Sequence, residues 1–481
     1  MEKEEGKYPD VRRAYIPKRC MNCKDPQCTK VCPTGATRQR TDGIVTMDYD
    51  RCIGCASCAL ACPYQARSLV HTQEWYYGEE TVQEKAVAHR ERLGVAQKCT
   101  FCAGRVDDGL AAGLTPGISP EASPACAASC ISQAIIFGDF NDPGSEVSKL
   151  SASGHYFRMH EKLGNDPQIR YLVETPAVPD RAPTVHDRDD DAMSDPANPL
   201  VGPRQRFWDM RAAMNFILGG LGSGTVVIAY LTGLFTAMGN ASLVTVFMLA
   251  GGIMALGLFF VWLKIGRKFR APFVILRPNS SWMSREVYAV GVFYLTLAAD
   301  WLQPHPFVHL LAAMGAGAFL YCQGRILHAG KGIPAWRVAQ MPWMLVAAGL
   351  LEGAALLAIV FVRYDQTMPP PGLAAGWVIG LVLVNAFLWR RYLSNAPAWG
   401  IGPLDQAVLA RTTPWLHGLG HVLPVVLFGA YLAWPAAPAW VVELGAILAI
   451  AGGFLWKAVV ITRACRQQSF ALGKYPYRGS G

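Results

Sequence analysis

Residues 52–63 read CIGCASCALACP, with the spacing C-x2-C-x2-C-x3-C-P that is typical of bacterial ferredoxins. A related stretch, CMNCKDPQCTKVCP, precedes it at residues 20–33. A loop with two-residue gaps wraps one [4Fe-4S] cube, whereas the fourth cysteine, followed by proline, reaches the neighbouring cube. The spacing therefore predicts two clusters with crossed ligands: Cys20, Cys23, Cys28 and Cys62 for one, and Cys52, Cys55, Cys58 and Cys32 for the other.

Zinc is the alternative to these clusters, because CxxC pairs also form tetrahedral four-cysteine sites. Zinc sites do not require a doubled quartet with trailing prolines, so the two quartets favour clusters. A third group has the ligands for another metal: Cys99, Cys102, Cys126 and Cys130. Its long internal gap leaves both a third [4Fe-4S] cluster and structural zinc open.

The 481-residue chain divides into a cysteine-rich polar front and an apolar back. All of its 14 cysteines except Cys322 and Cys465 precede residue 131. No apolar signal-peptide core precedes Cys20, so we expect reduced, metal-binding thiols rather than disulfides.

Three regions are expected along the chain. Residues 1–165 mix short apolar runs with turn residues, which favours an α+β ferredoxin-like domain held together by two or three [4Fe-4S] clusters. Residues 166–205 are rich in Pro and Asp and predict a linker. Residues 206–481 predict an all-α membrane bundle of about eight transmembrane helices.

The membrane prediction depends on apolar runs, most of which reach the ~20 residues that a helix needs to cross the hydrocarbon core. A buried soluble bundle would not supply so many long, nearly charge-free runs in succession. The third and fourth runs are shorter and flank DWLQPHP (300–306), which predicts a tight helical hairpin. The expected spans are 213–236, 241–263, 287–303, 306–322, 340–362, 372–389, 415–434 and 437–461.

The basic residues indicate membrane topology rather than nucleic-acid binding. The formal net charge is +9, but the lysines and arginines concentrate at the ends of the apolar runs. They gather on the side of the N-terminal domain, at 204–211, 264–285, 325–337, 390–411 and 457–478, whereas Arg363 lies on the opposite side. The positive-inside rule therefore predicts a multi-pass protein of the inner (cytoplasmic) membrane, with the iron-sulfur domain and both termini on the cytoplasmic side.

The order of the three cysteine groups, with TGATRQRTDGIV at 34–45 and ACPYQAR at 61–67, resembles the iron-sulfur subunits of the dimethyl sulfoxide reductase superfamily of molybdoenzymes. The resemblance covers residues 18–140. It implies an electron-transfer role beside a separate catalytic subunit that holds molybdenum or tungsten on a pterin cofactor.

The family pattern includes an additional N-terminal C-x2-C-x2-C-x3-C motif, which does not precede Cys20 here. In that pattern the group from Cys99 to Cys126 takes its fourth ligand from the additional motif, and Cys130 serves the cluster that this motif mostly builds. Two interpretations stay open: a three-cluster variant in which Cys130 closes the third site, or a chain that starts at an internal methionine.

The apolar half resembles the eight-helix anchor subunit of dimethyl sulfoxide reductase, most clearly at LKIGRKFRAPFVILRPNSSWMSREV (263–287). In that family the acidic residue of a Ser-x-Glu element lies at the quinol site, and Glu286 has the matching position. A quinone site needs an apolar slot, hydrogen-bond partners and a titratable group. The residues expected to supply them are Lys264, Arg270, Trp282, Ser284 and Glu286.

Other polar residues of the apolar half have competing interpretations. A carboxylate at Glu352, near the middle of the fifth span, either conducts protons or sits protonated in a helix-helix hydrogen bond. Asp300 lies near a span end, where exposure to headgroup water explains it. His417 and His421 share one helix, so we expect no haem. The glycines of GGLGSG (219–224) predict close helix packing.

We therefore expect a non-catalytic subunit that relays electrons between membrane quinone and a molybdopterin partner of the sulfite, phenylacetyl-CoA or dimethyl sulfoxide type. One alternative is a membrane transporter or redox sensor with a regulatory metal domain, which would need a file of polar residues through the spans. A heterodisulfide-type or hydrogenase-linked electron module is a second alternative.

Overall fold

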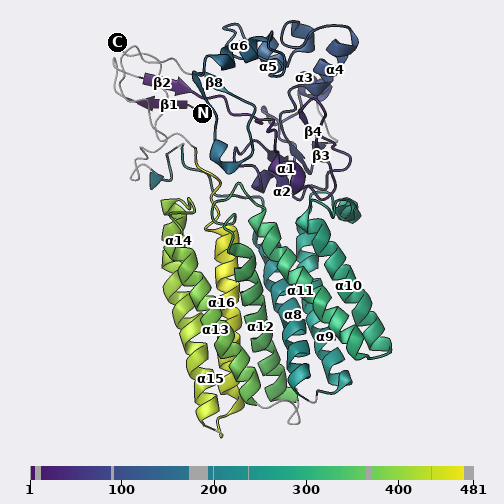
Figure 1. Ribbon diagram of the computed structural model, residues 1–481, viewed down its shortest axis with the longest axis vertical. Coiled ribbons are helices and arrows are strands. Elements are labelled where there is room, and N and C mark those ends of the chain that lie inside the picture. The colour runs from purple at the N-terminus through teal and green to yellow at the C-terminus, as the bar shows by residue number, and fades with distance from the viewer. Residues whose placement is uncertain are drawn as a thin grey trace.

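The computed structural model describes residues 2–5, 12–87, 92–172, 193–198, 200–236, 238–364, 371–434 and 436–470. It has two layers, a cysteine-rich N-terminal part above one end of a bundle of long helices (Figure 1). Most of the expected linker, residues 173–192 and 199, lies outside the described residues. The boundaries of the three regions therefore stay a prediction.

The described strands of the N-terminal part form small antiparallel hairpins rather than one large sheet. In the second hairpin Thr37 pairs with Met47 and Gln39 with Val45, which leaves the turn around Gly43 between them. Such short strands cannot enclose a large apolar core. The pairs are β1 (Glu2–Glu5) with β2 (Arg12–Tyr15), β3 (Thr37–Gln39) with β4 (Val45–Met47), β5 (Ser68–Val70) with β6 (Val95–Gln97), and β7 (Tyr156–Phe157) with β8 (Tyr171–Leu172).

Short helices lie between the strands along the chain, and two of them fall inside the cysteine motifs. Helix α1 (Gln27–Lys30) carries Cys28, and α2 (Ser57–Leu60) carries Cys58. The others are α3 (Val82–Val87), α4 (Ala103–Ala111), α5 (Ala125–Ala128), α6 (Glu146–Ala152), and the 3-10 turns η2 (Pro120–Ala122) and η3 (Glu161–Leu163).

The apolar half is a bundle of long helices that run roughly parallel to one another (Figure 1). In the described residues, 7 helices are long and apolar enough to cross a membrane. Helix α10 is a further long helix of the bundle, and it carries Arg285, Glu286 and Asp300. The bundle comprises α8 (Met210–Phe235), α9 (Asn240–Lys264), α10 (Trp282–Leu302), α11 (Pro306–His328), α12 (Met341–Tyr364), α13 (Pro371–Ser394), α14 (Pro403–Trp415), η5 (Leu416–Val422), α15 (Leu423–Ala433) and α16 (Ala439–Thr462).

Two sequence predictions about the bundle are confirmed. Helix α10 ends at Leu302 and α11 begins at Pro306, so the expected tight hairpin is present. The glycines of α8 do permit close packing, because a Cβ on Gly224 would lie 1.8 Å from the Gly349 oxygen of α12. Similarly, a Cβ on Gly222 would lie 2.6 Å from the Ala250 oxygen of α9.

Two expectations about charged residues are wrong. Asp300 is fully buried rather than exposed to headgroup water, and its Oδ1 lies 3.0 Å from His309 Nε2. Lys457 is not an interfacial cation of the tail, because it lies inside α16 with 1 % of its side chain exposed. Its Nζ donates to Glu352 Oε2 at 2.7 Å. Glu352 therefore has a buried basic partner, as an intramembrane carboxylate requires.

The two layers are joined through backbone contacts, which glycines make possible. Gly54 has φ +71°, and a Cβ there would lie 2.1 Å from the Gly94 oxygen of the same layer and 3.1 Å from Gly266 Cα of the bundle layer. Gly266, in the segment that follows α9, approaches the same oxygen, since its Cβ would lie 2.2 Å away. The Gly332 N–H, after α11, donates to the Leu60 oxygen at 2.9 Å. The second cysteine motif thus packs directly against the end of the bundle.

Candidate metal centres and an adjoining pocket

The first quartet combines three cysteines of the first motif with the last cysteine of the second. Burial raises the pKa of the Cys23 thiol, and three neighbouring thiols raise it further: Cys62, Cys28 and Cys20. Burial also raises the pKa of Cys62 to about 11, with Cys28 and Cys20 again among the causes. The four thiols expected to share one cluster therefore lie within reach of one another's charge.

The second quartet has the reciprocal composition. Burial raises the pKa of Cys58, and the neighbouring thiols raise it further: Cys55, Cys32 and Cys52. The same four cysteines line a cavity together with Pro33, Thr34, Thr37, Met47, Ile53, Ala56 and Ala96. Each group of neighbouring thiols thus includes a cysteine from the other motif, and the assignment of one cluster to each group stays a prediction.

Backbone and hydroxyl groups face these sulfurs and suit thiolate ligands. The Thr37 N–H donates to Cys32 Sγ at 3.5 Å, and N–H groups of Ala96 and Gly54 face Cys52. Hydrogen bonds to the charged form offset the burial that otherwise disfavours a thiolate. The donor set and the cavity therefore fit a four-cysteine cluster in the second quartet, and the neighbouring thiols of the first quartet supply the same donor set. Among the described residues, no three His, Cys, Asp or Glu side chains are grouped to hold a single metal ion.

The four cysteines of the third group are all partly exposed. Burial raises the pKa of the Cys99 thiol, and the charge of Cys20 raises it further. Cys99 therefore lies beside the first quartet. Cys102 begins α4 in a left-handed conformation (φ 51°), and Cys126 lies on α5. The Cys130 sulfur lies 3.5 Å from Ser132 Oγ, and that hydrogen bond lowers the pKa of this thiol. Whether the group holds a cluster stays a prediction.

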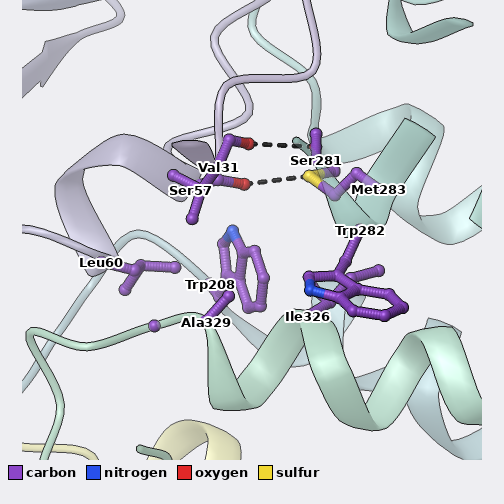
Figure 2. A pocket seen from close by; sticks show the side chains of 10 residues that line it. Val31, Ser57, Leu60, Trp208, Ser281, Trp282, Met283, Ile326 and Ala329 are labelled. Atoms are coloured by element: carbon purple, nitrogen blue, oxygen red, sulfur yellow. Dashed lines mark hydrogen bonds between the residues drawn. The ribbon is translucent and has the colours of Figure 1, made fainter. Parts of the chain in front are cut away.

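An apolar pocket lies between the second quartet and the helix bundle (Figure 2). Val31 and Ser57 on its upper side are sequence neighbours of Cys32 and Cys58. Its lining is Val31, Ser57, Leu60, Trp208, Ser281, Trp282, Met283, Ile326, Ala329 and Gly330.

Hydrogen bonds across this pocket tie the cysteine loops to the bundle. Ser281 Oγ donates to the Val31 oxygen at 3.2 Å, and Ser57 Oγ lies 2.9 Å from Met283 Sδ (Figure 2). The Trp208 indole N–H donates to the Cys55 oxygen at 3.0 Å. A molecule in the pocket would thus contact Val31 and Ser57, the sequence neighbours of Cys32 and Cys58.

Of the five residues expected at a quinone site, Trp282 lines this pocket. Two guanidinium groups lie over its ring, those of Arg285 at 4.2 Å and Arg325 at 4.6 Å from the ring centroid. Lys264 is buried, with 8 % of its surface exposed, and lies close enough to Cys55 for their charges to interact.

The other three expected residues make separate contacts. Ser284 Oγ donates to the Val274 oxygen. Glu286 is buried and its Oε1 accepts from Asn215 Nδ2 at 3.3 Å. Arg270 points to the N-terminal part, where its Nη1 donates to the Tyr49 oxygen at 2.9 Å. The structure therefore brings Trp282 to the pocket and Lys264 near Cys55, and directs Arg270 elsewhere.

Sequence reasoning missed most of the pocket. Trp208, Leu60 and Met283 come from separate segments, and no motif joins them. A tryptophan just ahead of the first span is typical of a membrane interface, so Trp208 alone carried a usable signal.

The comparisons with known proteins agree with the cysteine pattern. Residues 11–77 match the family model of the 4Fe-4S dicluster domain. The chain is 39 % identical over 189 residues to a selenate reductase subunit of Mesobacillus selenatarsenatis, which covers 36 % of this chain and 60 % of that protein. It is 36 % identical over 173 residues to the putative dimethyl sulfoxide reductase iron-sulfur subunit of Halobacterium salinarum, covering 35 % of this chain and 60 % of the relative.

A third relative is the iron-sulfur cluster-binding subunit of the menaquinone reductase of Nitratidesulfovibrio vulgaris, 40 % identical over 173 residues. That match covers 34 % of this chain and 68 % of the relative. The protein is thus an iron-sulfur electron-transfer subunit joined to a helical part with membrane-type spans. It belongs to the family of iron-sulfur subunits of dimethyl sulfoxide reductase-type molybdoenzyme complexes.

Proposed function

We propose that this chain relays electrons through [4Fe-4S] clusters between the membrane quinone pool and a separate molybdopterin catalytic subunit. The two quartets hold one cluster each, which supplies a one-electron redox centre when bound. The observation that carries the proposal is the apolar pocket of Figure 2, which adjoins the second quartet through Val31 and Ser57.

The order of the centres follows from their neighbours. The pocket adjoins the second quartet, and Cys28 and Cys32 link the two quartets within one motif. Cys99 then adjoins the first quartet through Cys20. The proposed route therefore runs from the pocket through the second and first quartets to the group at Cys99–Cys130, which we propose holds a third cluster.

Quinone oxidation and reduction also move protons, so the pocket needs titratable groups near it. Trp282 and Trp208 offer flat apolar surfaces for a quinone ring, and the serines of the pocket offer hydrogen bonds. We propose that Glu286 and Lys264, both buried at this end of the bundle, exchange the protons. Ser284 positions the loop through Val274, and Arg270 fastens it to the N-terminal part.

The partner and the membrane setting are also proposals. The catalytic subunit would carry molybdenum or tungsten and act in a sulfite, phenylacetyl-CoA or dimethyl sulfoxide type reaction. The iron-sulfur part would lie on the cytoplasmic side of the inner membrane, where the basic residues gather. Similarity to a menaquinone reductase subunit favours, as a second candidate, a quinone-linked electron module with a different partner.

Filling the pocket tests this function. Ala329 lines it, so Ala329→Phe should leave the cluster signals intact and slow their reduction by a soluble quinol at least tenfold. Ala298→Phe, at an exposed position of α10, is the matched control. The purified native complex would be mixed with quinol and followed by EPR, and its other subunits identified. Equal reduction rates in both variants and the parent would exclude the pocket as the quinone site.

A further inference from the structure

Arg67 is a buried cation that none of the roles above uses. It ends the stretch ACPYQAR, five residues after Cys62, and has 5 % of its surface exposed. Its Nη2 donates to Cys28 Sγ at 3.1 Å, and its Nη1 donates to Thr37 Oγ1 at 3.1 Å. Met47 Sδ lies 3.7 Å from the same Nη1. One nitrogen of the guanidinium thus donates to Cys28, a cysteine of the first quartet.

This guanidinium lies near both quartets, because its partners Thr37 and Met47 also line the cavity of the second quartet. Burial alone would lower the pKa of Arg67, but neighbouring thiols raise it above its ordinary value. The thiols concerned are Cys28, Cys58, Cys20 and Cys62, and Cys58 belongs to the second quartet. Arg67 in turn acts on Cys58, because its charge opposes the burial that raises the pKa of that thiol. Arg67 therefore lies where the two quartets meet.

A buried guanidinium is unstable unless negative charge balances it. Among the ion pairs of the described residues, none joins Arg67 to a carboxylate. The negative charge around it comes from cysteine sulfurs. A cube with four thiolate ligands is an anion, and each added electron increases that negative charge.

We propose that Arg67 is a shared positioning residue that stabilises the reduced state of both clusters and thereby raises both reduction potentials. The proposal rests on the proposed function, because it requires a cluster in each quartet. In each step one electron leaves one cluster and enters the other. Arg67 keeps its proton throughout, and no bond forms or breaks. Because Arg67 donates an N–H to Cys28, its effect on the reduction potential should be larger for the first quartet than for the second.

Redox-titrated EPR of the purified complex tests the proposal, with Arg67→Met as the charge-removing variant. We expect at least a tenfold decrease in the ratio of reduced to oxidised first-quartet cluster at a fixed potential, which is about 59 mV for a one-electron couple. Arg67→Lys keeps the charge and should lose less than the neutral variant. The matched control is Arg40→Met, since Arg40 lies in the same part of the chain and pairs with Asp107.

The outcomes separate this proposal from the proposed function. If the parent complex lacks about eight cluster irons, the proposed function fails before Arg67 is tested. If the parent and Arg67→Met carry full iron and have equal potentials, Arg67 has no electrostatic role. If Arg67→Met and Arg67→Gln both lose iron while Arg67→Lys keeps it, the charge is needed by the paired clusters. Loss of iron from all three variants would mean that only the shape of arginine matters, which overturns the proposal.

Discussion

The Lys457–Glu352 pair allows a quantitative test of the helix bundle. Both side chains are 1 % exposed, and the Lys457 Nζ to Glu352 Oε2 distance is 2.7 Å. The second carboxylate oxygen, Glu352 Oε1, has no hydrogen-bond partner in the described part of the chain. Removing one member of a buried ion pair leaves an uncompensated charge and costs about 3–5 kcal/mol. We therefore expect Lys457→Met to lower the free energy of unfolding by that amount.

The assay is unfolding of the purified protein in detergent, followed by tryptophan fluorescence over a denaturant series. The double variant Lys457→Met/Glu352→Gln removes both charges and should be more stable than Lys457→Met alone by roughly 1–3 kcal/mol. Arg363→Met is the matched control, because Arg363 also pairs with a glutamate, Glu443, but is 63 % exposed. That control should lose at most about 1 kcal/mol. A Lys457→Met protein as stable as the Arg363→Met protein would refute the reasoning.

Three further predictions concern the N-terminal part. Cys62→Ser should abolish the cluster of the first quartet and spare that of the second, although Cys62 lies in the second motif. An EPR spectrum that lacked the second-quartet cluster and kept the first would contradict the crossed ligands. Stripping iron with a chelator should unfold the cysteine-rich part while the helices of the bundle persist, because metal ligation there replaces a large apolar core. Circular dichroism and limited proteolysis would detect this unfolding, and protease resistance of the stripped part would argue against it. Gly54→Ala should destabilise the protein by about 1–3 kcal/mol, since its φ is +71° and its Cβ would lie 2.1 Å from the Gly94 oxygen of the N-terminal part and 3.1 Å from Gly266 Cα in the segment after α9. Gly43→Ala, also at positive φ but with open space around it, is the control in a thermal unfolding assay.

The cysteine spacing and the lengths of the apolar runs predicted most of the architecture. The crossed grouping follows from the reach of a loop around a cube, and the hairpin between α10 and α11 follows from run length and two prolines. These features depend on residues close in sequence, for which spacing is a sufficient guide.

Contacts between distant segments were not predictable in the same way. Lys457 follows Glu352 by 105 residues, and hydropathy does not specify which faces of α12 and α16 meet. Asp300 was misjudged for the same reason, since only the packing of α10 on α11 brings His309 to it. The pocket combines residues from the cysteine loops, the segment before α8, α10 and the end of α11, and Arg67 lies near cysteines of both quartets.

Cluster content combined with quinol reduction tests the central claim most directly. The purified native complex would be analysed for iron and acid-labile sulfide per chain, then mixed anaerobically with quinol and examined by EPR. The account predicts about twelve irons with matching sulfide, or about eight if the group at Cys99–Cys130 binds zinc, and signals from the clusters that respond to quinol. Fewer than about eight irons, or full clusters that neither quinol nor quinone affects, would contradict it.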